Sequence, residues 1–121
     1  MPLIKIYGVP KKHWPEANSL KKAIQTRLEE NKDEFKISKG ATSIFFPKDI
    51  LEESILDDTF GSEIIIDLQL LGKEGRTPEV VKATADAIVE TIRNHDAFKR
   101  IPLIECFSTV LPRELFSQSK L

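Results

Sequence analysis

Pro2 has the most distinctive chemistry available in this sequence, because it directly follows the initiator methionine. If Met1 is removed, the amino terminus becomes the secondary amine of Pro2. An apolar pocket or nearby cations would disfavour the protonated amine and bring its pKa toward the working pH, so that it can act as a base. With Met1 attached, the same nitrogen is a tertiary amide and cannot be a base. The alternative is that Pro2 is an ordinary proline at the start of a strand.

Arg76 is the second candidate, because an arginine offers a planar fork of donors to a carboxylate or to an enolate-like anion. It comes just before Thr77, Pro78 and Glu79, a segment typical of a helix start, and the amino end of a helix favours anions. The alternative is a surface arginine in a loop. The glycines beside it match neither a Walker loop nor a dinucleotide fingerprint, which argues against nucleotide binding and predicts a turn.

The remaining reactive side chains indicate packing rather than catalysis. Cys106 is the single cysteine, so the chain can form no intramolecular disulfide, and its apolar surroundings in the sequence predict a buried thiol. His13 is expected to anchor a loop beside Trp14, and His95 lies where the carboxyl end of a helix favours positive charge. No cluster of metal ligands is visible in the sequence, and we expect neither a metal nor another cofactor.

Composition indicates one globular domain of 121 residues. The chain is 40% hydrophobic and 31% charged, and its net charge of −1 argues against a nucleic-acid binder. We expect neither a leader sequence nor a membrane span, because no basic-then-apolar segment opens the sequence and no apolar run approaches roughly 20 residues. Because a single cysteine fits a reducing compartment, we expect a cytoplasmic protein. The charge and the lack of a long apolar run predict that it binds neither nucleic acid nor a membrane.

The elements that would position these residues alternate between strands and helices. Three- and four-residue spacing predicts one helix from residue 18 or 19 to residue 30 and another from residue 77 to about 93. Asn18 or Ser19 is expected to cap the first helix, and Thr77 the second. Residues 48–62 are expected to form a loop. Apolar runs predict strands at residues 3–9, 42–46, 63–71 and 103–110.

This order predicts a single domain of two β-α-β halves, roughly residues 2–47 and 63–110, followed by a C-terminal tail at 111–121. Corresponding positions lie 61 residues apart, as in Leu3 and Ile64. Each half is expected to join two parallel strands by a right-handed crossover. The result is an α+β domain with a four-stranded mixed sheet and two helices packed on one face. Because residues 63–71 look apolar on both sides, we expect another subunit to cover the second face.

The Met-Pro start, the duplicated halves and the segment Leu-Leu-Gly-Lys-Glu-Gly-Arg-Thr-Pro-Glu at residues 70–79 together resemble the tautomerase superfamily. Within it, the chain is most similar to long fused-repeat members such as 5-carboxymethyl-2-hydroxymuconate isomerase and macrophage migration inhibitory factor. The resemblance implies a homotrimer with an active site at the subunit edge. There Pro2 would move a proton between carbons of a small keto or enol acid without a cofactor, while Arg76 and Leu71 would bind the substrate.

One feature of the family pattern is missing. The isomerase has an arginine just before the second strand, where this chain has Ala41 and Thr42, and Lys39 is the nearest substitute. Two functions therefore remain open. The first is a cofactor-independent tautomerase or isomerase acting on a small unsaturated keto acid, with Pro2 as base and Arg76 and Lys39 holding the anion. The second is a catalytically inactive trimeric scaffold that binds a small ligand or a protein partner.

Overall fold

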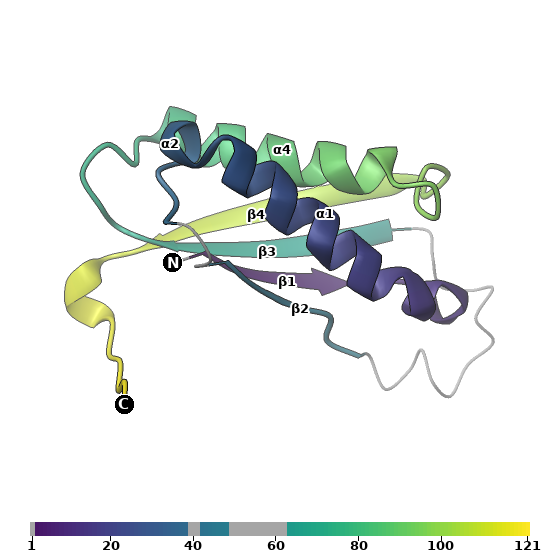
Figure 1. Cartoon of the computed structure of the whole chain (residues 1–121), viewed down its shortest axis with the longest axis horizontal. Coiled ribbons are helices and arrows are strands. Elements are labelled where there is room, and N and C mark those ends of the chain that lie inside the picture. Colours follow the sequence, from purple (N-terminus) through teal and green to yellow (C-terminus); the bar gives the residue numbers. More distant parts are fainter. Residues whose placement is uncertain (1, 39–41, 49–62) are drawn as a thin grey trace.

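A computed structural model of the chain describes residues 2–38, 42–48 and 63–121. Two strand–helix–strand units follow each other along the chain (Figure 1). Every predicted strand and helix is present, with ends within two residues of those predicted, and most of the expected loop, residues 49–62, lies outside the described residues. The elements are β1 (Leu3–Tyr7), the 3-10 helix η1 (Lys11–Glu16), α1 (Ala17–Glu30), α2 (Lys32–Phe35), β2 (Ser43–Phe45), β3 (Glu63–Leu71), α4 (Pro78–Asn94), β4 (Leu103–Leu111) and the 3-10 helix η3 (Arg113–Leu115).

All four strands form one mixed sheet in the order β2-β1-β3-β4. Each half contributes a parallel pair, β1 with β2 and β3 with β4, and the halves join through the antiparallel pair of β1 and β3. The helices α1 and α4 contact each other and lie on one face of the sheet (Figure 1). This arrangement confirms the predicted α+β fold with its two main helices on one face.

The two halves repeat with an offset of 60 residues rather than the predicted 61. Ile4 pairs with Ile44 in the first half and Ile64 pairs with Ile104 in the second, so the same pairing recurs 60 positions later. The predicted offset is wrong because side chains alternate between the two faces of a strand, and a shift of one residue would exchange the faces. Ile4 and Ile64 are both fully buried under the helices, as equivalent positions must be.

One apolar core fills the space between the helices and the sheet. Helical spacing places one stripe of α1 and one stripe of α4 against the sheet, and alternate residues of β1 and β3 meet them. Burial of one leucine or isoleucine side chain contributes about 1.5–3 kcal/mol, so this layer holds the domain together. Its fully buried members include Ile4, Ile6, Leu20, Ile24, Ile64, Ile66, Leu68, Ile88 and Ile92.

The opposite face of the sheet, which we call the open face, is mixed rather than apolar. Ile65, Asp67 and Gln69 of β3 are half-buried there, and the Gln69 amide donates to the Asp67 carboxylate at 3.2 Å. Phe45 of β2 and Phe107 of β4 are more than half exposed. The prediction that β3 is apolar on both sides is therefore wrong, because polar residues occupy alternate positions of the strand.

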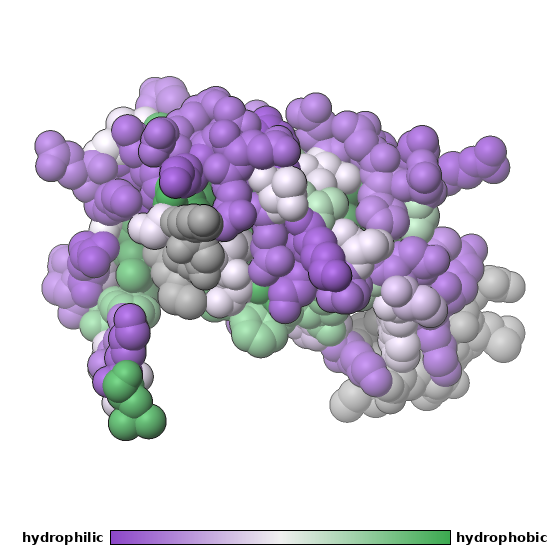
Figure 2. Space-filling view, in the orientation of Figure 1, coloured by the Kyte–Doolittle hydropathy of each residue, from purple (hydrophilic) through white to green (hydrophobic). Residues whose placement is uncertain are grey.

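The start of α4 is built as predicted. Thr77 Oγ1 accepts a hydrogen bond from the Val80 amide at 3.3 Å, and Pro78 is the first residue of the helix. The outer surface of the helical layer is largely hydrophilic (Figure 2). Within residues 2–38, 42–48 and 63–121, no helix combines the length and the apolar character that crossing a membrane requires.

The start of α1 differs from the prediction, because the chain enters it already helical. The 3-10 helix η1 runs directly into α1, which begins at Ala17 without a side-chain cap. Asn18 and Ser19 therefore lie inside the helix, and Ser19 Oγ donates to the Glu16 carbonyl oxygen at 2.9 Å. The same hydroxyl lies 3.0 Å from Nε2 of His95, just after α4, so it links the two helices.

Candidate active site

Pro2 is buried directly before β1, the strand that lies between β2 and β3. Its carbonyl oxygen accepts a hydrogen bond from the Ser43 amide at 3.0 Å, which holds the residue in the sheet. It lines a cavity of about 290 Å³, which we call the Pro2 cavity. An apolar wall of this kind favours a neutral amine over a charged one. The apolar lining comes from Leu3, Phe45, Leu70, Leu71, Leu111 and Phe116.

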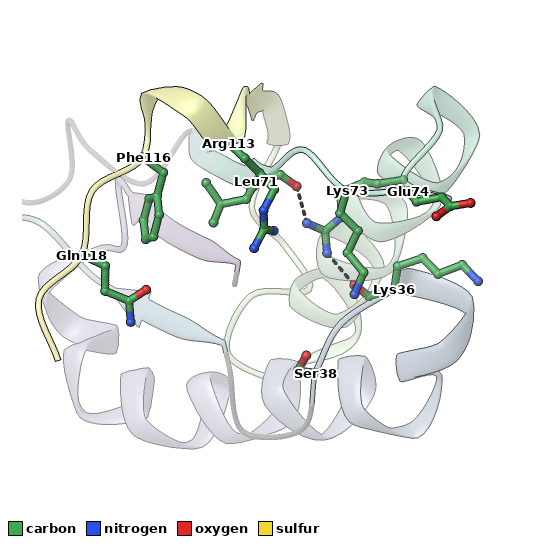
Figure 3. Close-up of a pocket in the computed structure, with 9 residues that line it drawn as sticks. Lys36, Ser38, Leu71, Lys73, Glu74, Arg113, Phe116 and Gln118 are labelled. Carbon is green, nitrogen blue, oxygen red and sulfur yellow. Dashed lines mark hydrogen bonds between the residues drawn. The ribbon is translucent and has the colours of Figure 1, made fainter. Parts of the chain in front are cut away.

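A second cavity, of about 550 Å³, is shown in Figure 3. It adjoins the first, because Leu71 and Phe116 line both. We call it the basic cavity. Four basic side chains and one carboxylate line it, and this excess of positive charge attracts anions. These residues are Lys36, Lys73, Arg76, Arg113 and Glu74.

Three of the four predicted site residues lie at this end of the sheet. Pro2 and Leu71 line the Pro2 cavity, and Leu71 and Arg76 line the basic cavity. The fourth, Lys39, lies outside the described residues. Leu71 lines both cavities, so it connects the cavity that contains Pro2 with the cavity that contains Arg76.

The main chain holds Arg76 in place. Its guanidinium donates one hydrogen bond to the Leu71 carbonyl oxygen and another, at 2.5 Å, to the Lys36 carbonyl oxygen, which Figure 3 marks with dashed lines. Its Nε is buried and finds no hydrogen-bond partner among the described residues. Burial lowers the pKa of Arg76, and the nearby charge of Arg113 lowers this pKa further. Arg76 thus brings a fixed positive charge to the cavity while it ties β3 to the end of α2.

A short turn between β3 and α4 places Arg76. The Gly72 amide donates to the Leu111 carbonyl oxygen at 2.8 Å, which extends the pairing of β3 with β4 by one residue. Gly75 has a φ of 81°, a left-handed conformation that glycine adopts readily. The Arg76 amide then donates to the Lys73 carbonyl oxygen at 3.1 Å before the helix begins. The two glycines are turn formers, as the sequence predicts.

Three of the basic residues in this cavity are not predicted from the sequence. Lys36 ends α2, and Lys73 Nζ donates to its carbonyl oxygen at 3.3 Å. Arg113 follows β4 and is exposed, and Figure 3 shows its guanidinium directed into the cavity. Because Leu71 pairs with Leu111, the residues after these parallel strands meet at one edge of the sheet. Arg113 and Lys73 could therefore be predicted at this site from the pairing of the two strands after which they come.

The other reactive side chains lie outside both cavities. Burial raises the pKa of the Cys106 thiol to about 11, against the opposing effect of a hydrogen bond with Ser108. His13 and His95 both pack against the Phe98 ring, at centroid distances of 5.5 and 5.1 Å. In the parts of the chain that the structure describes, no three His, Cys, Asp or Glu side chains are grouped to hold a metal ion.

Several solved structures share this fold. A 5-carboxymethyl-2-hydroxymuconate isomerase from Deinococcus radiodurans R1 matches with a TM-score of 0.56 and 20% identity, over 98% of this chain and 88% of that chain. A malonate semialdehyde decarboxylase matches with a TM-score of 0.62 and 13% identity, over 98% and 91% of the two chains. A fused 4-OT in an asymmetric trimer matches with a TM-score of 0.61 and 17% identity, over 96% and 91%.

No family model and no curated protein matches this sequence. The likeness is therefore one of three-dimensional structure, and it extends over nearly the whole length of each chain. The isomerase, the decarboxylase and the fused 4-OT are all members of the tautomerase superfamily. The chain has the tautomerase fold, as its resemblance to that superfamily predicts.

Proposed function

We propose that this protein is a cytoplasmic, cofactor-independent tautomerase or isomerase that moves a proton within a small unsaturated keto acid. One observation carries the proposal: the apolar cavity that contains Pro2 adjoins the basic cavity at Leu71 and Phe116. An acid lying across this junction would place its reacting carbons near Pro2 and its carboxylate among the basic side chains. The isomerase activity of a protein with the same fold is consistent with this chemistry.

Pro2 would act as the base once Met1 is removed, since its nitrogen is then a secondary amine. The apolar walls and the nearby positive charges both disfavour the protonated amine. The neutral amine takes a proton from a carbon beside the carbonyl, or from the hydroxyl group of the enol form, and either step leaves the same conjugated enolate. The enolate then receives the proton at another carbon and becomes the conjugated ketone. The proton that leaves one atom returns to another, so the reaction balances without an oxidant or a reductant.

The basic cavity would hold the carboxylate and the developing negative charge. Arg113 is the best placed donor, because its guanidinium is exposed and directed into the cavity, whereas Arg76 already donates to two carbonyl oxygens. A charge-assisted hydrogen bond of this kind contributes about 1.5–3 kcal/mol. Arg76 would add its fixed charge, and Lys39 is proposed as a further cation near the anion.

We propose a homotrimer as the working form. Phe45 and Phe107 leave large aromatic surfaces exposed on the open face, and contact with another subunit would bury them. The fused 4-OT with this fold is a trimer. Phe45 also lines the Pro2 cavity, so a neighbouring subunit on this face would lie close to the site.

The alternative is a scaffold without turnover that binds a small ligand or a protein partner. Arg76 favours this alternative, because its guanidinium is engaged by main-chain carbonyls on two sides. In that case the basic cavity would retain an acid that the protein does not convert.

Intact and native masses of the untagged protein, followed by turnover on a panel of enol acids, test the proposal. We expect a trimer that lacks Met1 and forms the ketones. Pro2→Ala should lower the rate by about 100-fold or more, because a positioned base contributes roughly that much. Pro102→Ala, at an exposed position before β4, is the matched control and should leave the rate unchanged. A processed trimer without conversion, or an undiminished rate in Pro2→Ala, would reject catalysis and favour the scaffold.

A further inference from the structure

Residues 112–121, which we call the C-terminal arm, leave the sheet after β4 and form one wall of the basic cavity. Two backbone hydrogen bonds fold the first part of the arm, from the Leu115 amide to Pro112 and from the Phe116 amide to Arg113, each at 3.0 Å. All residues of the arm are exposed, yet three of its side chains line the cavity. These are Arg113, Phe116 and Gln118 (Figure 3).

Phe116 holds a different position from its neighbours in the arm, because it lines both cavities. The residue is 42% exposed and lines the Pro2 cavity as well as the basic cavity. Leu115, the preceding residue in the same turn, is 69% exposed and lines neither of these cavities. Phe116 therefore lies where the two cavities meet, whereas its neighbour Leu115 in the same turn faces the solvent.

The second residue common to both cavities is Leu71, at the end of β3. A ligand that reaches from the Pro2 cavity into the basic cavity must therefore pass an aromatic ring and a branched aliphatic side chain. The face of an aromatic ring packs well against a flat, conjugated group. A saturated chain fits less well, because it must also give up rotational freedom to lie flat in such a passage.

We propose that Phe116 determines specificity at this site, by selecting acids whose carbons next to the carboxylate are flat and conjugated. This inference rests on the proposed function, since it concerns the same pair of cavities. The conjugated carbons lie along the Phe116 ring and Leu71, and the carboxylate lies beyond them beside Arg113. Because Arg113 and Phe116 belong to one turn, a single segment recognises both the charge and the shape of the ligand.

Binding of two matched acids tests the inference without requiring turnover. Sorbate (hexa-2,4-dienoate) and hexanoate have the same number of carbons and the same charge, but only sorbate is conjugated and flat. We expect the native protein to bind sorbate about two- to tenfold more tightly, as an aromatic contact of about 0.5–1.5 kcal/mol gives. Dissociation constants come from NMR chemical-shift titrations of each protein with each acid.

Three variants test whether the preference for sorbate over hexanoate comes from the ring of Phe116. In Phe116→Ala the ratio of the two dissociation constants should fall at least about twofold, by loss of that aromatic contact. Phe116→Tyr should keep the native ratio, because it keeps the ring. Leu115→Ala removes an exposed side chain from the same turn and should also keep the native ratio. NMR spectra of the free proteins establish that all three are folded.

The inference is overturned if Phe116→Ala keeps the native ratio, if Leu115→Ala lowers it equally, or if neither acid binds. Failure of the proposed function gives a different pattern, in which no enol acid is converted although the preference for sorbate follows Phe116. Conversely, if turnover depends on Pro2 while the ratio of the two dissociation constants is the same in Phe116→Ala as in the native protein, only the inference is rejected.

Discussion

The guanidinium of Arg76 and the main-chain carbonyl of Lys36 are joined by a 2.5 Å hydrogen bond, although 40 positions separate the two residues. The same guanidinium donates to the Leu71 carbonyl oxygen, so it connects the end of β3 with the end of α2. Lys36 adopts a left-handed backbone conformation, with a φ of 56°, where the helix stops. Arg76 therefore acts as a structural clamp at the rim of the basic cavity.

Loss of the Arg76 clamp should destabilise the fold. We expect Arg76→Ala to lower the free energy of unfolding by about 2 kcal/mol, because two carbonyl oxygens lose a charged donor. Arg76→Lys should recover only part of this, since lysine lacks the planar fork. Urea unfolding measures the effect, and Arg100→Ala, at an exposed position, should stay within about 0.5 kcal/mol of the native protein. Equal stability of the Arg76→Ala and Arg100→Ala proteins would show that the clamp is not structural.

Arg113 should show the opposite behaviour, with an effect on binding and little effect on stability. Its side chain is exposed and directed into the basic cavity. We expect Arg113→Ala to weaken the binding of sorbate by about 10-fold or more, as the loss of one charge-assisted hydrogen bond implies. NMR titration measures binding, and Arg100→Ala removes the same charge near the opposite end of β4. If both variants weaken binding equally, the effect comes from overall charge and not from Arg113.

Cys106 should react slowly in the native protein. Burial raises the pKa of its thiol from 9.0 to about 11, so the thiolate fraction near pH 8 is about 100-fold smaller than in the unfolded chain. Alkylation by iodoacetamide, measured by mass spectrometry, should therefore be slow in buffer and fast in urea.

The same thiol should make folding stability depend on pH. Above pH 9 the unfolded state loses its thiol proton first, so this group should lower folding stability between pH 9 and 11. Comparison with Cys106→Ala isolates that pH dependence, and rapid alkylation of the native protein at pH 8 would contradict the expectation.

Two glycines with positive φ should differ in their tolerance of a side chain. At Gly8, with a φ of 86°, an added Cβ would lie 2.5 Å from the main-chain oxygen of Glu63. At Gly75 it would lie 3.3 Å from the flexible end of the Lys36 side chain, which can move. We therefore expect Gly8→Ala to cost more than about 2 kcal/mol and Gly75→Ala about 1 kcal/mol. Thermal or urea unfolding gives both values, and the reverse order would contradict this geometry.

The cap of α4 gives a smaller and more local prediction. Thr77 Oγ1 accepts the Val80 amide hydrogen, and loss of such a cap costs about 1 kcal/mol. Thr77→Ala should be destabilised by this amount in urea unfolding, while Thr77→Ser keeps the acceptor and should stay close to the native value. A serine variant as unstable as the alanine variant would show that the methyl group of Thr77, and not its oxygen, is responsible.

Local patterns were sufficient to predict the elements that carry Arg76. Thr77 and Pro78 mark the start of α4 because helix capping involves only neighbours in the sequence. The end of β3 at Leu71 follows from the apolar run and the glycines after it. The prediction for the open side of β3 is wrong, although Asp67 and Gln69 stand two positions apart, which is the alternation of a strand with one open face.

The remaining features depend on how distant segments pair. Arg113 reaches the basic cavity because Leu71 and Leu111 are paired at the end of β3 and β4. Lys36 arrives there because α2 ends at that point, and this short helix has no periodic pattern of its own. Ser19 looked like a cap but lies inside α1, because η1 already supplies the first helical turns. The pairing of distant segments decides where Arg113 and Lys36 lie, and no local pattern in the sequence contains this information.

The 60-residue register between the halves has a chemical consequence. Counted by that offset along the sequence, the residue that corresponds to Pro2 is Ser62, which lies outside the described residues. A polypeptide has only one free amino terminus, so the nitrogen of Ser62 is committed to a peptide bond whatever happens to Met1. Joining two like halves in one chain thus leaves half as many terminal amines as two separate halves would have. Only one of the two halves can therefore carry a terminal amine that acts as a base.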